Sequence, residues 1–466
     1  MKLRINNLGA VKEAEIDISK KLNIFCGPNG TGKTYVAYAL YGALKPKFHI
    51  GSNDELIDEL IKNKNITINI DTNLEFINNY REDLISSFRE NLDSLFGVSD
   101  DFVEQNFKDT ELSFIENNET LNNLIIASEF EISKSYGKVD IEISKQKNSP
   151  ELSIKILDET ISTTDIKGLK MFFFSDLIDV LAKYPISSVF ILPVERNSIY
   201  TFSKELSIRK QEAVDYFHAA TSKGGSENEN LLNILLKKTK RYPLPIRDGL
   251  IIADDLSEIK KNKSDFFDFA EEIEQELLAG KLEIDNDGEI KFKPKKSPKK
   301  ALPIHMTASI IKSLSSLVVY LKHLAKPNDL IIIDEPEINL HPDNQITLTR
   351  LFARLINKGF RFLISTHSDY IVREFNNLVM LSNGDYIVEE KAEELGYKAY
   401  EFINKEDIDV HYFNYPNRQR GNKQVSVEKL TIEDTGFEIP SIDKIIEDQN
   451  NIAEELFYQL KYSDDE

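Results

Sequence analysis

Cysteine is almost absent from this chain, which has one, Cys26, among 466 residues. A single thiol cannot form an internal disulfide, so no disulfide framework holds the fold together. Cys26 ends the apolar run Leu22–Cys26, and we expect it to be a small core side chain. This cysteine usage agrees with a reducing compartment such as the cytoplasm.

Long hydrophobic runs are also missing. The start, Met1–Asn7, lacks the apolar stretch of a secretory signal, and no segment approaches the ~18 apolar residues needed to cross a bilayer. We therefore expect a cytoplasmic protein with no membrane contact. The sequence shows no repeat of fixed period and no long low-complexity tract.

Positive charge is in deficit, because 58 Lys and Arg residues stand against 78 Asp and Glu residues, a net charge of −20. A surface of this sign repels nucleic acid at long range. The charge therefore disfavours direct DNA clamping and leaves DNA binding an open question. The length suggests about two to three structural units with a sizeable core.

One complete phosphate-loop pattern, G-x-x-x-x-G-K-[ST], is present. Its residues are Gly27, Pro28, Asn29, Gly30, Thr31, Gly32, Lys33 and Thr34. The glycines let backbone N–H groups turn toward phosphates, Lys33 reaches the β and γ oxygens, and Thr34 ligates Mg²⁺. An apolar strand precedes the loop, and Val36, Leu40 and Leu44 repeat at helical spacing after it. A chance glycine turn would lack this context, so the sequence predicts ATP and Mg²⁺ as cofactors.

A second motif lies far downstream, where the buried-strand pattern Leu330–Ile333 runs into Asp334 and Glu335. Four consecutive aliphatic residues are typical of a parallel strand covered on both faces. Asp334 is expected to hold the Mg²⁺ shell, and Glu335 to orient or deprotonate the attacking water. An ordinary solvated strand end is the alternative, and the accompanying phosphate loop argues against it.

A third motif follows the apolar strand Phe362–Ile364, which ends in Ser365, Thr366, His367 and Ser368. The strand would bring the imidazole of His367 to the same edge of the sheet, where it is a candidate γ-phosphate sensor. The alternative is a capping or core histidine.

These motifs, with the segments Leu3–Ala14 and Ile191–Arg196, resemble the ABC-type ATPases of the SMC, RecF and OLD branch. The resemblance implies an α/β fold, an ABC-type P-loop ATPase head with a mixed sheet, helices and an antiparallel β subdomain, interrupted by a helical insertion. It predicts an N-terminal lobe over 1–202, the insertion over 203–284, a C-terminal lobe over 285–400 and a C-terminal extension over 401–466. Within these, Ile66–Ile70, Val139–Ser144 and Leu152–Ile156 read as antiparallel strands, and Leu282–Phe292 reads as a hairpin.

The family builds its catalytic site across a dimer, so the resemblance implies a homodimer or a higher homo-oligomer. The signature that reaches the opposing γ-phosphate corresponds to Thr307–Ile311, where Ser309 is retained and the glycines are gone. Ser309 either contacts that phosphate or only caps its helix. Gln105 and Gln211 are available as the metal-contacting glutamine, and neither is favoured.

Two further features stay open at this point. Glu195 and Arg196 lie where the family places polar residues near the nucleotide, but a surface salt bridge is an equal reading. The basic run Lys291–Lys300 indicates a solvated loop or a contact with phosphate or an acidic partner.

Too few residues follow Ser368 for the Toprim metal-nuclease domain of OLD nucleases, although Asp407 and Asp409 mimic its Asp-x-Asp pair. The chain therefore resembles the ATPase subunits of two-gene anti-phage systems, first the PARIS ATPase and next the Septu ATPase. This resemblance implies an ATPase that senses and scaffolds, holds and releases a separate nuclease effector, answers a viral trigger protein and has no nuclease activity itself. The alternative is a RecF-like ATPase of DNA repair and maintenance.

Overall fold

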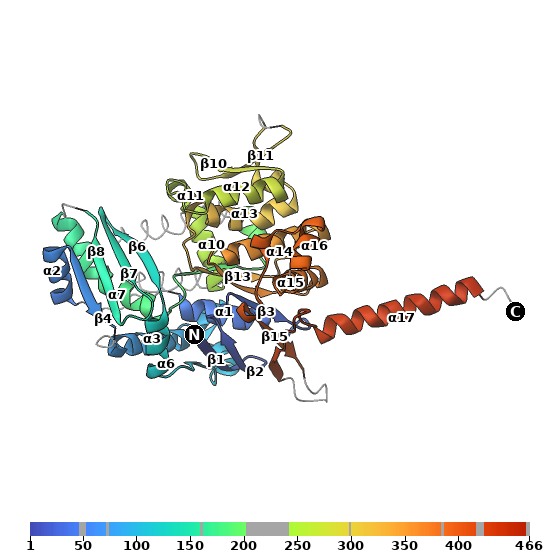
Figure 1. Ribbon diagram of the computed structural model, residues 1–466, viewed down its shortest axis with the longest axis horizontal. Helices are drawn as coiled ribbons and strands as arrows, with labels where there is room; N and C mark the ends of the chain where they lie inside the picture. The colour runs from blue at the N-terminus through green and yellow to red at the C-terminus, as the bar shows by residue number, and fades with distance from the viewer. Residues whose placement is uncertain are drawn as a thin grey trace, which may run out of the picture.

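The computed structural model describes residues 1–45, 53–70, 74–158, 162–201, 242–297, 300–383, 386–415 and 424–462. It contains a mixed main sheet with helices on both faces, a separate antiparallel sheet, and a helical layer that carries a small hairpin (Figure 1). The α/β fold class expected from the sequence, with its mixed sheet and antiparallel β subdomain, is confirmed.

The main sheet has the strand order β5-β1-β2-β16-β15-β3-β14-β13-β9. The strands are β5 Glu111–Phe114, β1 Lys2–Leu8, β2 Val11–Asp17, β16 Val425–Leu430, β15 Ile408–Asn414, β3 Leu22–Cys26, β14 Arg361–Ser365, β13 Leu330–Asp334 and β9 Val189–Leu192. From β15 to β9 each neighbouring pair is parallel, whereas β1 pairs with β2 and β5, and β15 with β16, in antiparallel fashion. The carboxyl ends of β3, β14 and β13 therefore meet at one edge.

Both faces of the parallel strands are covered, which explains their unbroken aliphatic sequences. Ile331 and Ile333 of β13 enter one core, and Leu330 and Ile332 enter the core on the opposite face. Helices α13 Ser309–His323, α14 Pro342–Asn357 and α15 Asp369–Ser382 contribute to the first core. Helix α1 Lys33–Leu44, which begins at the phosphate loop, contributes to the second.

The antiparallel sheet has the order β4-β8-β7-β6 and its own core. Its strands are β4 Asn65–Asn69, β8 Glu151–Ile156, β7 Val139–Lys145 and β6 Phe130–Tyr136, and its helices are α2 Asp54–Asn63, α3 Leu74–Glu90, α6 Asn118–Ala127 and α7 Thr163–Ala182. The predicted antiparallel strands are confirmed by the pairing register. Leu84, Phe88, Leu92 and Phe96 repeat every four residues but do not share one helix, because α3 ends at Glu90 and the short α4 Leu92–Phe96 begins after Asn91. Helix α5 Asp100–Asn106 follows.

The first part of the predicted insertion, residues 203–241, lies outside the described residues, and Gln211 lies there too. From residue 242 the chain forms α10 Leu244–Asp254, α11 Leu256–Ile259, α12 Phe267–Ile273 and the π-helical turn η2 Glu274–Leu278. Phe269 and Ile273 of α12 share a core with Leu314 and Leu317 of α13, so this segment packs on the helical layer.

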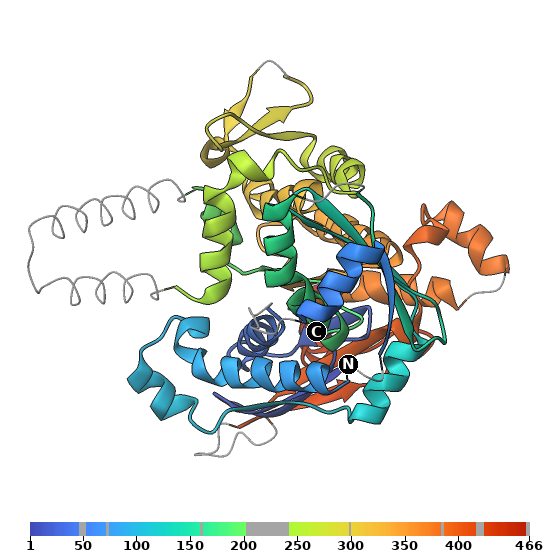
Figure 2. The same cartoon turned by 90° about the vertical axis from the view of Figure 1, so that its left-hand side faces the viewer.

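The predicted hairpin is confirmed, because β10 Gly280–Ile284 pairs antiparallel with β11 Ile290–Pro294, and β12 Leu302–Pro303 adds to it. It stands at the top of the molecule in Figure 2. Of the basic run, Lys291 pairs with Asp285 at 2.7 Å and Lys293 with Glu283 at 2.6 Å, so these two charges are partnered inside the hairpin. Pro298 and Lys299 lie outside the described residues.

The last part of the chain returns to the main sheet. After α16 Tyr386–Glu394 and the 3₁₀ turns η4 Ala399–Glu401 and η5 Lys405–Asp407, β15 lies directly beside β3, and β16 lies between β15 and β2. Helix α17 Pro440–Tyr462 then leaves the body (Figure 1). The proposed extension over 401–466 thus contributes strands to the sheet that carries the phosphate loop. None of the helices in the described segments has the length and hydropathy of a membrane span.

The position of β15 predicts that Phe413 is essential for stability. Its side chain is fully buried and its ring centroid lies 5.1 Å from that of Phe25. Phe413→Ala should lower the free energy of unfolding by about 3–5 kcal/mol, measured by denaturant unfolding. Phe457→Ala, at a phenylalanine that is 55% exposed on α17, is the matched control and should change stability by less than about 0.5 kcal/mol. Equal effects of the two substitutions would show that β15 is not part of the cooperative fold.

Candidate functional site: a nucleotide cleft at the sheet edge

The phosphate loop, Gly27 to Gly32, connects β3 to the first turn of α1. Gly27 adopts φ +127°, and a Cβ there would lie 2.1 Å from the carbonyl oxygen of Phe413, so no side chain fits. Gly32 adopts φ +88° immediately before α1 and offers no capping side chain to the helix. The first N–H groups of α1 therefore face the loop without a side-chain cap, which is the arrangement that binds phosphate.

Lys33 lies inside the curve of the loop. Its Nζ donates hydrogen bonds to the carbonyl oxygens of Gly27 and Pro28, both at 2.9 Å. Burial lowers the pKa of Lys33 to about 8, and the nearby carboxylate of Asp334 opposes this shift. The ammonium group is thus mostly charged at neutral pH and poorly hydrated, so it is suited to an anionic ligand.

Asp334 is buried at the end of β13 and connects the three strand ends. Its Oδ2 accepts a hydrogen bond from Thr34 Oγ1 at 2.8 Å, and its Oδ1 accepts one from Ser365 Oγ. A hydroxyl oxygen and a carboxylate oxygen side by side are hard donors of the kind that Mg²⁺ prefers. Thr34 and Asp334 therefore fit the metal expected from the sequence.

Glu335 and Glu337 follow Asp334 and differ in their surroundings. Burial and the charge of Asp334 raise the pKa of Glu335, which lines the cleft. Burial also raises the pKa of Glu337, but its carboxylate accepts hydrogen bonds from the backbone N–H of His367 at 2.7 Å and from Thr366 Oγ1 at 3.0 Å. Glu337 thus holds the loop that carries His367, whereas Glu335 faces the cleft.

His367 is partly buried at the end of β14. Burial, and then the charge of Lys33, lowers the pKa of its imidazole to about 4. The ring is therefore neutral at physiological pH and offers one hydrogen-bond donor and one acceptor.

Arg196, after β9, is buried with 2% of its surface exposed, so the surface salt-bridge interpretation is wrong for this residue, whereas Glu195 is exposed. Its Nη1 donates to the carbonyl oxygens of Asp334 at 2.7 Å and Pro193 at 3.1 Å, and its Nη2 donates to that of Glu335 at 2.7 Å. Burial lowers the pKa of Arg196 to about 10, which leaves the guanidinium charged. Glu335 has φ +48°, a left-handed conformation that costs about 1–3 kcal/mol and needs such support.

One cleft of about 350 Å³ brings most of the predicted site together. It is lined by Ala10, Asn29, Gly30, Thr31, Gly32, Lys33, Thr34, Tyr35, Asp334, Glu335 and His367. Residues that are far apart in sequence thus meet where strands β3, β13 and β14 end. Tyr415 supports the loop from β15, since its hydroxyl donates to the carbonyl oxygen of Gly30 at 2.8 Å.

Of the predicted site residues, Gly27, Pro28 and Ser309 are absent from the lining of this cleft, and so is Gln105. Ser309 is exposed as the first residue of α13; Ala308 is the N-cap, and no side-chain cap is formed, so the prediction that Ser309 caps its helix is wrong. Gln105 on α5 lines a different cavity of about 750 Å³ beside Asn7 and Arg89. Sequence reasoning missed the roles of Arg196, Glu337 and Tyr415, and only the position of Arg196 directly after an apolar strand gave a signal.

The profile of the AAA ATPase domain matches residues 1–372. This chain belongs to the AAA ATPase domain family. The phosphate-loop ATPase expected from the sequence is therefore confirmed at the level of the family. None of the curated proteins compared with it matches.

Solved SMC heads resemble this AAA ATPase at low identity. An SMC head bound to the C-winged helix domain of ScpA is 14% identical, with a TM-score of 0.31 over 92% of this chain and 98% of that chain. The SMC head domain from Thermotoga maritima is 10% identical, with a TM-score of 0.29 over 92% and 98%. An SMC head with an extended coiled coil, bound to the C-terminal domain of ScpA from Pyrococcus furiosus, is 15% identical, with a TM-score of 0.30 over 96% and 98%.

The contacts of Arg196 predict that its fork geometry is needed in this AAA ATPase. Arg196→Lys keeps the charge but lacks the planar fork whose two nitrogens, Nη1 and Nη2, reach the carbonyl oxygens of Asp334 and Glu335 from fixed positions. ATP turnover should fall by about 10- to 100-fold, since small displacements of reacting groups are costly, while nucleotide affinity should change much less.

Arg361→Lys is the matched control. Arg361 donates to the carbonyl oxygen of Ser19 and to Asn328 Oδ1, both at 3.4 Å, at the opposite end of β14. The two variants are compared with the wild type by steady-state ATP turnover and by nucleotide titration. If Arg361→Lys lost turnover as severely as Arg196→Lys, the effect would be one of general stability.

Proposed function

We propose that this AAA ATPase binds Mg²⁺–ATP in the cleft and hydrolyses it there. The observation that carries this proposal is the convergence of Lys33, Thr34, Asp334, Glu335 and His367 on one cleft. The loop N–H groups and Lys33 would hold the phosphates, and Thr34 and Asp334 would hold the metal. The metal supplies charge neutralisation on the β and γ phosphates when it is bound.

Glu335 is the residue that we assign as the general base. A water molecule that attacks the γ-phosphate must lose a proton, and a carboxylate with a raised pKa accepts it more readily. Glu337 is the next candidate, but its carboxylate is occupied by the backbone N–H of His367 and by Thr366. The neutral ring of His367 is placed to hydrogen-bond a γ-phosphate oxygen and so to report its presence.

We further propose that hydrolysis takes place in a homodimer or higher homo-oligomer, in which Ser309 of one copy faces the cleft of another. Its exposure at the uncapped start of α13 supports this role, because the hydroxyl and the first N–H groups of the helix are available to an anion. That the catalytic site is shared between two copies is inferred from the resemblance to ABC-type ATPases.

The biological setting is proposed from the sequence resemblance. The chain would be the ATPase subunit of an anti-phage complex that holds a separate nuclease effector and releases it when a viral trigger protein is sensed. Both members of the apparent nuclease pair are engaged elsewhere, since Asp407 pairs with Lys21 at 2.9 Å and buried Asp409 with Lys429 at 2.7 Å. This favours a chain without nuclease activity. The net charge of −20 weighs against the alternative of a RecF-like DNA repair ATPase.

Two substitutions should distinguish the residues needed to bind ATP from those needed to hydrolyse it. Lys33→Ala removes the phosphate countercharge and should abolish ATP binding in a calorimetric titration. Glu335→Gln keeps the shape and should bind ATP normally, while phosphate release falls by about 10²–10⁴-fold. Glu337→Gln is the matched control and should retain more turnover than Glu335→Gln. The reverse order would make Glu337 the base, and normal ATP affinity in Lys33→Ala would refute the nucleotide cleft.

The role of Ser309 predicts a dependence on protein concentration. Ser309→Arg would place bulk and charge between subunits, so turnover per chain should fall while ATP affinity is kept. Ser309→Ala should change stability by less than about 0.5 kcal/mol, because the side chain forms no cap. Turnover is measured over a range of protein concentrations for wild type and both variants. Activity that is independent of concentration in a verified monomer would rule out the composite site.

A further inference from the structure

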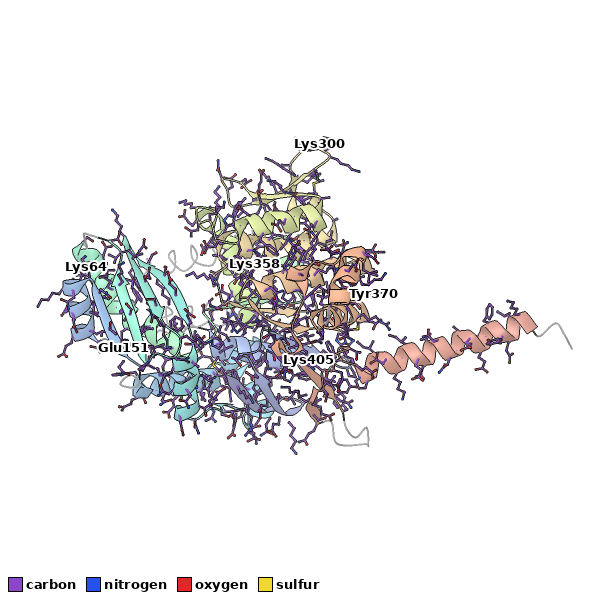
Figure 3. All side chains as sticks on the ribbon, in the orientation of Figure 1. Lys64, Glu151, Lys300, Lys358, Tyr370 and Lys405 are labelled. Carbon is purple, nitrogen blue, oxygen red and sulfur yellow. The ribbon has the colours of Figure 1, made fainter. Side chains whose placement is uncertain are left out.

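Within the part of the chain that the structure describes, helix α17 contacts the body only at its start. Phe437 and Ile439 are buried in the first core and Ile442 packs against that core, which fixes the direction of the helix. Every described side chain from Glu447 to Lys461 is exposed. Figure 3 shows the helix extending from the body with side chains along its length. In proteins, most of the stability of a helix comes from packing of its apolar face, and the exposed part of α17 lacks that contribution.

The exposed part of α17 carries an apolar stripe. Ile445 is 63% exposed, Ile452 51% and Leu456 59%. Ile452 follows Ile445 by seven residues and Leu456 follows Ile452 by four, which places Ile445 and Ile452 at heptad positions d and Leu456 at a position a. Leu460, at position e, is 81% exposed and widens the stripe. This spacing is that of a seam between helices.

A polar residue in the middle of the apolar stripe indicates which partner covers the stripe. The a position between Ile442 and Leu456 is Gln449. In an apolar groove its amide would be buried without a partner, which costs about 1–3 kcal/mol. In register with a second α17, each Gln449 meets the same amide, and the two can hydrogen-bond. A polar residue at one a position is also a device that specifies register.

The flanking charges indicate the orientation. Positions g are occupied by Asp448 and Glu455, and positions e by Ala453 and Leu460. An antiparallel pair brings g against g and would set acidic side chains against each other. A parallel pair brings g against e, so each carboxylate lies beside an apolar residue and keeps its water.

We propose that α17 forms a parallel, in-register coiled coil with α17 of a second copy of this chain. The coil does not depend on nucleotide. Since each helix leaves its own head, the pair tethers two ATPase heads and raises the effective concentration of one head at the other. Only this last consequence rests on the composite site proposed above.

The test is the molar mass of the full-length chain without nucleotide, measured by light scattering and sedimentation across concentrations. Ile452→Glu with Leu456→Glu puts two charges into the seam, and association should weaken by at least ~100-fold. Asn450→Glu with Asn451→Glu is the matched control, because it adds the same charge on the same turns at outer positions b and c. The control should associate as the wild type does.

A monomeric wild type, or equal weakening in seam and control variants, would overturn the proposal. Circular dichroism and thermal unfolding verify that all variants fold, which is expected because these positions are exposed.

The relative orientation of the two α17 helices is measured by disulfide cross-linking. Leu456→Cys should form an intermolecular disulfide under mild oxidation, because a parallel in-register pair places the two thiols together, and the native Cys26 is buried. Failure to cross-link, with association retained, would exclude the parallel register.

Measurements of ATP turnover distinguish a failure of the coiled-coil proposal from a failure of the proposed ATPase function. The seam variant should regain wild-type turnover at high protein concentration. If the coiled coil forms but neither the wild type nor any variant hydrolyses ATP, the proposed ATPase function is contradicted and the coiled-coil proposal is not.

Discussion

The carboxylate of Asp334 is the interaction on which the site depends. It accepts hydrogen bonds from Thr34 at the start of α1 and from Ser365 at the end of β14, while its own backbone carbonyl is held by Arg196 after β9. One residue thus joins four segments, through its carboxylate and its backbone carbonyl, and these segments meet because the strands are parallel and in register. A shift of one residue in β13 would turn this carboxylate to the other face of the sheet.

The electrostatics of the cleft follow from this junction. Lys33 and Arg196 are buried cations near the acidic pair Asp334 and Glu335, so each sign compensates the other in a region of little water. His367 remains neutral because burial, and then the charge of Lys33, lowers the pKa of its imidazole. Such a site is close to charge balance before any ligand arrives, and Mg²⁺ would offset part of the negative charge that a nucleotide brings.

The sequence predicted those parts of the fold whose signals are local. The phosphate loop, the apolar strands that precede Asp334 and Ser365, and the Leu282–Phe292 hairpin segment are contiguous patterns, and each specifies its own conformation. Long-range pairing carries no such signal, so nothing local indicated that Ile408–Asn414 would lie beside β3. The role of Arg196 was only partly indicated: its position after an apolar strand suggested a place near the nucleotide, but nothing local showed that it is buried and donates to carbonyl oxygens. The hypothesis that Ser309 caps its helix was wrong by one position, because the N-cap residue is Ala308.

The central claim is that one cleft receives the nucleotide, and amide hydrogen exchange with a non-hydrolysable ATP analogue and Mg²⁺ tests it most directly. Ligand should slow exchange together in three separate segments, residues 27–36, 334–338 and 365–368, because they line or support the same cleft. Protection confined to the larger cavity beside Asn7, Arg89 and Gln105, or absent from the segment around Asp334, would contradict the account.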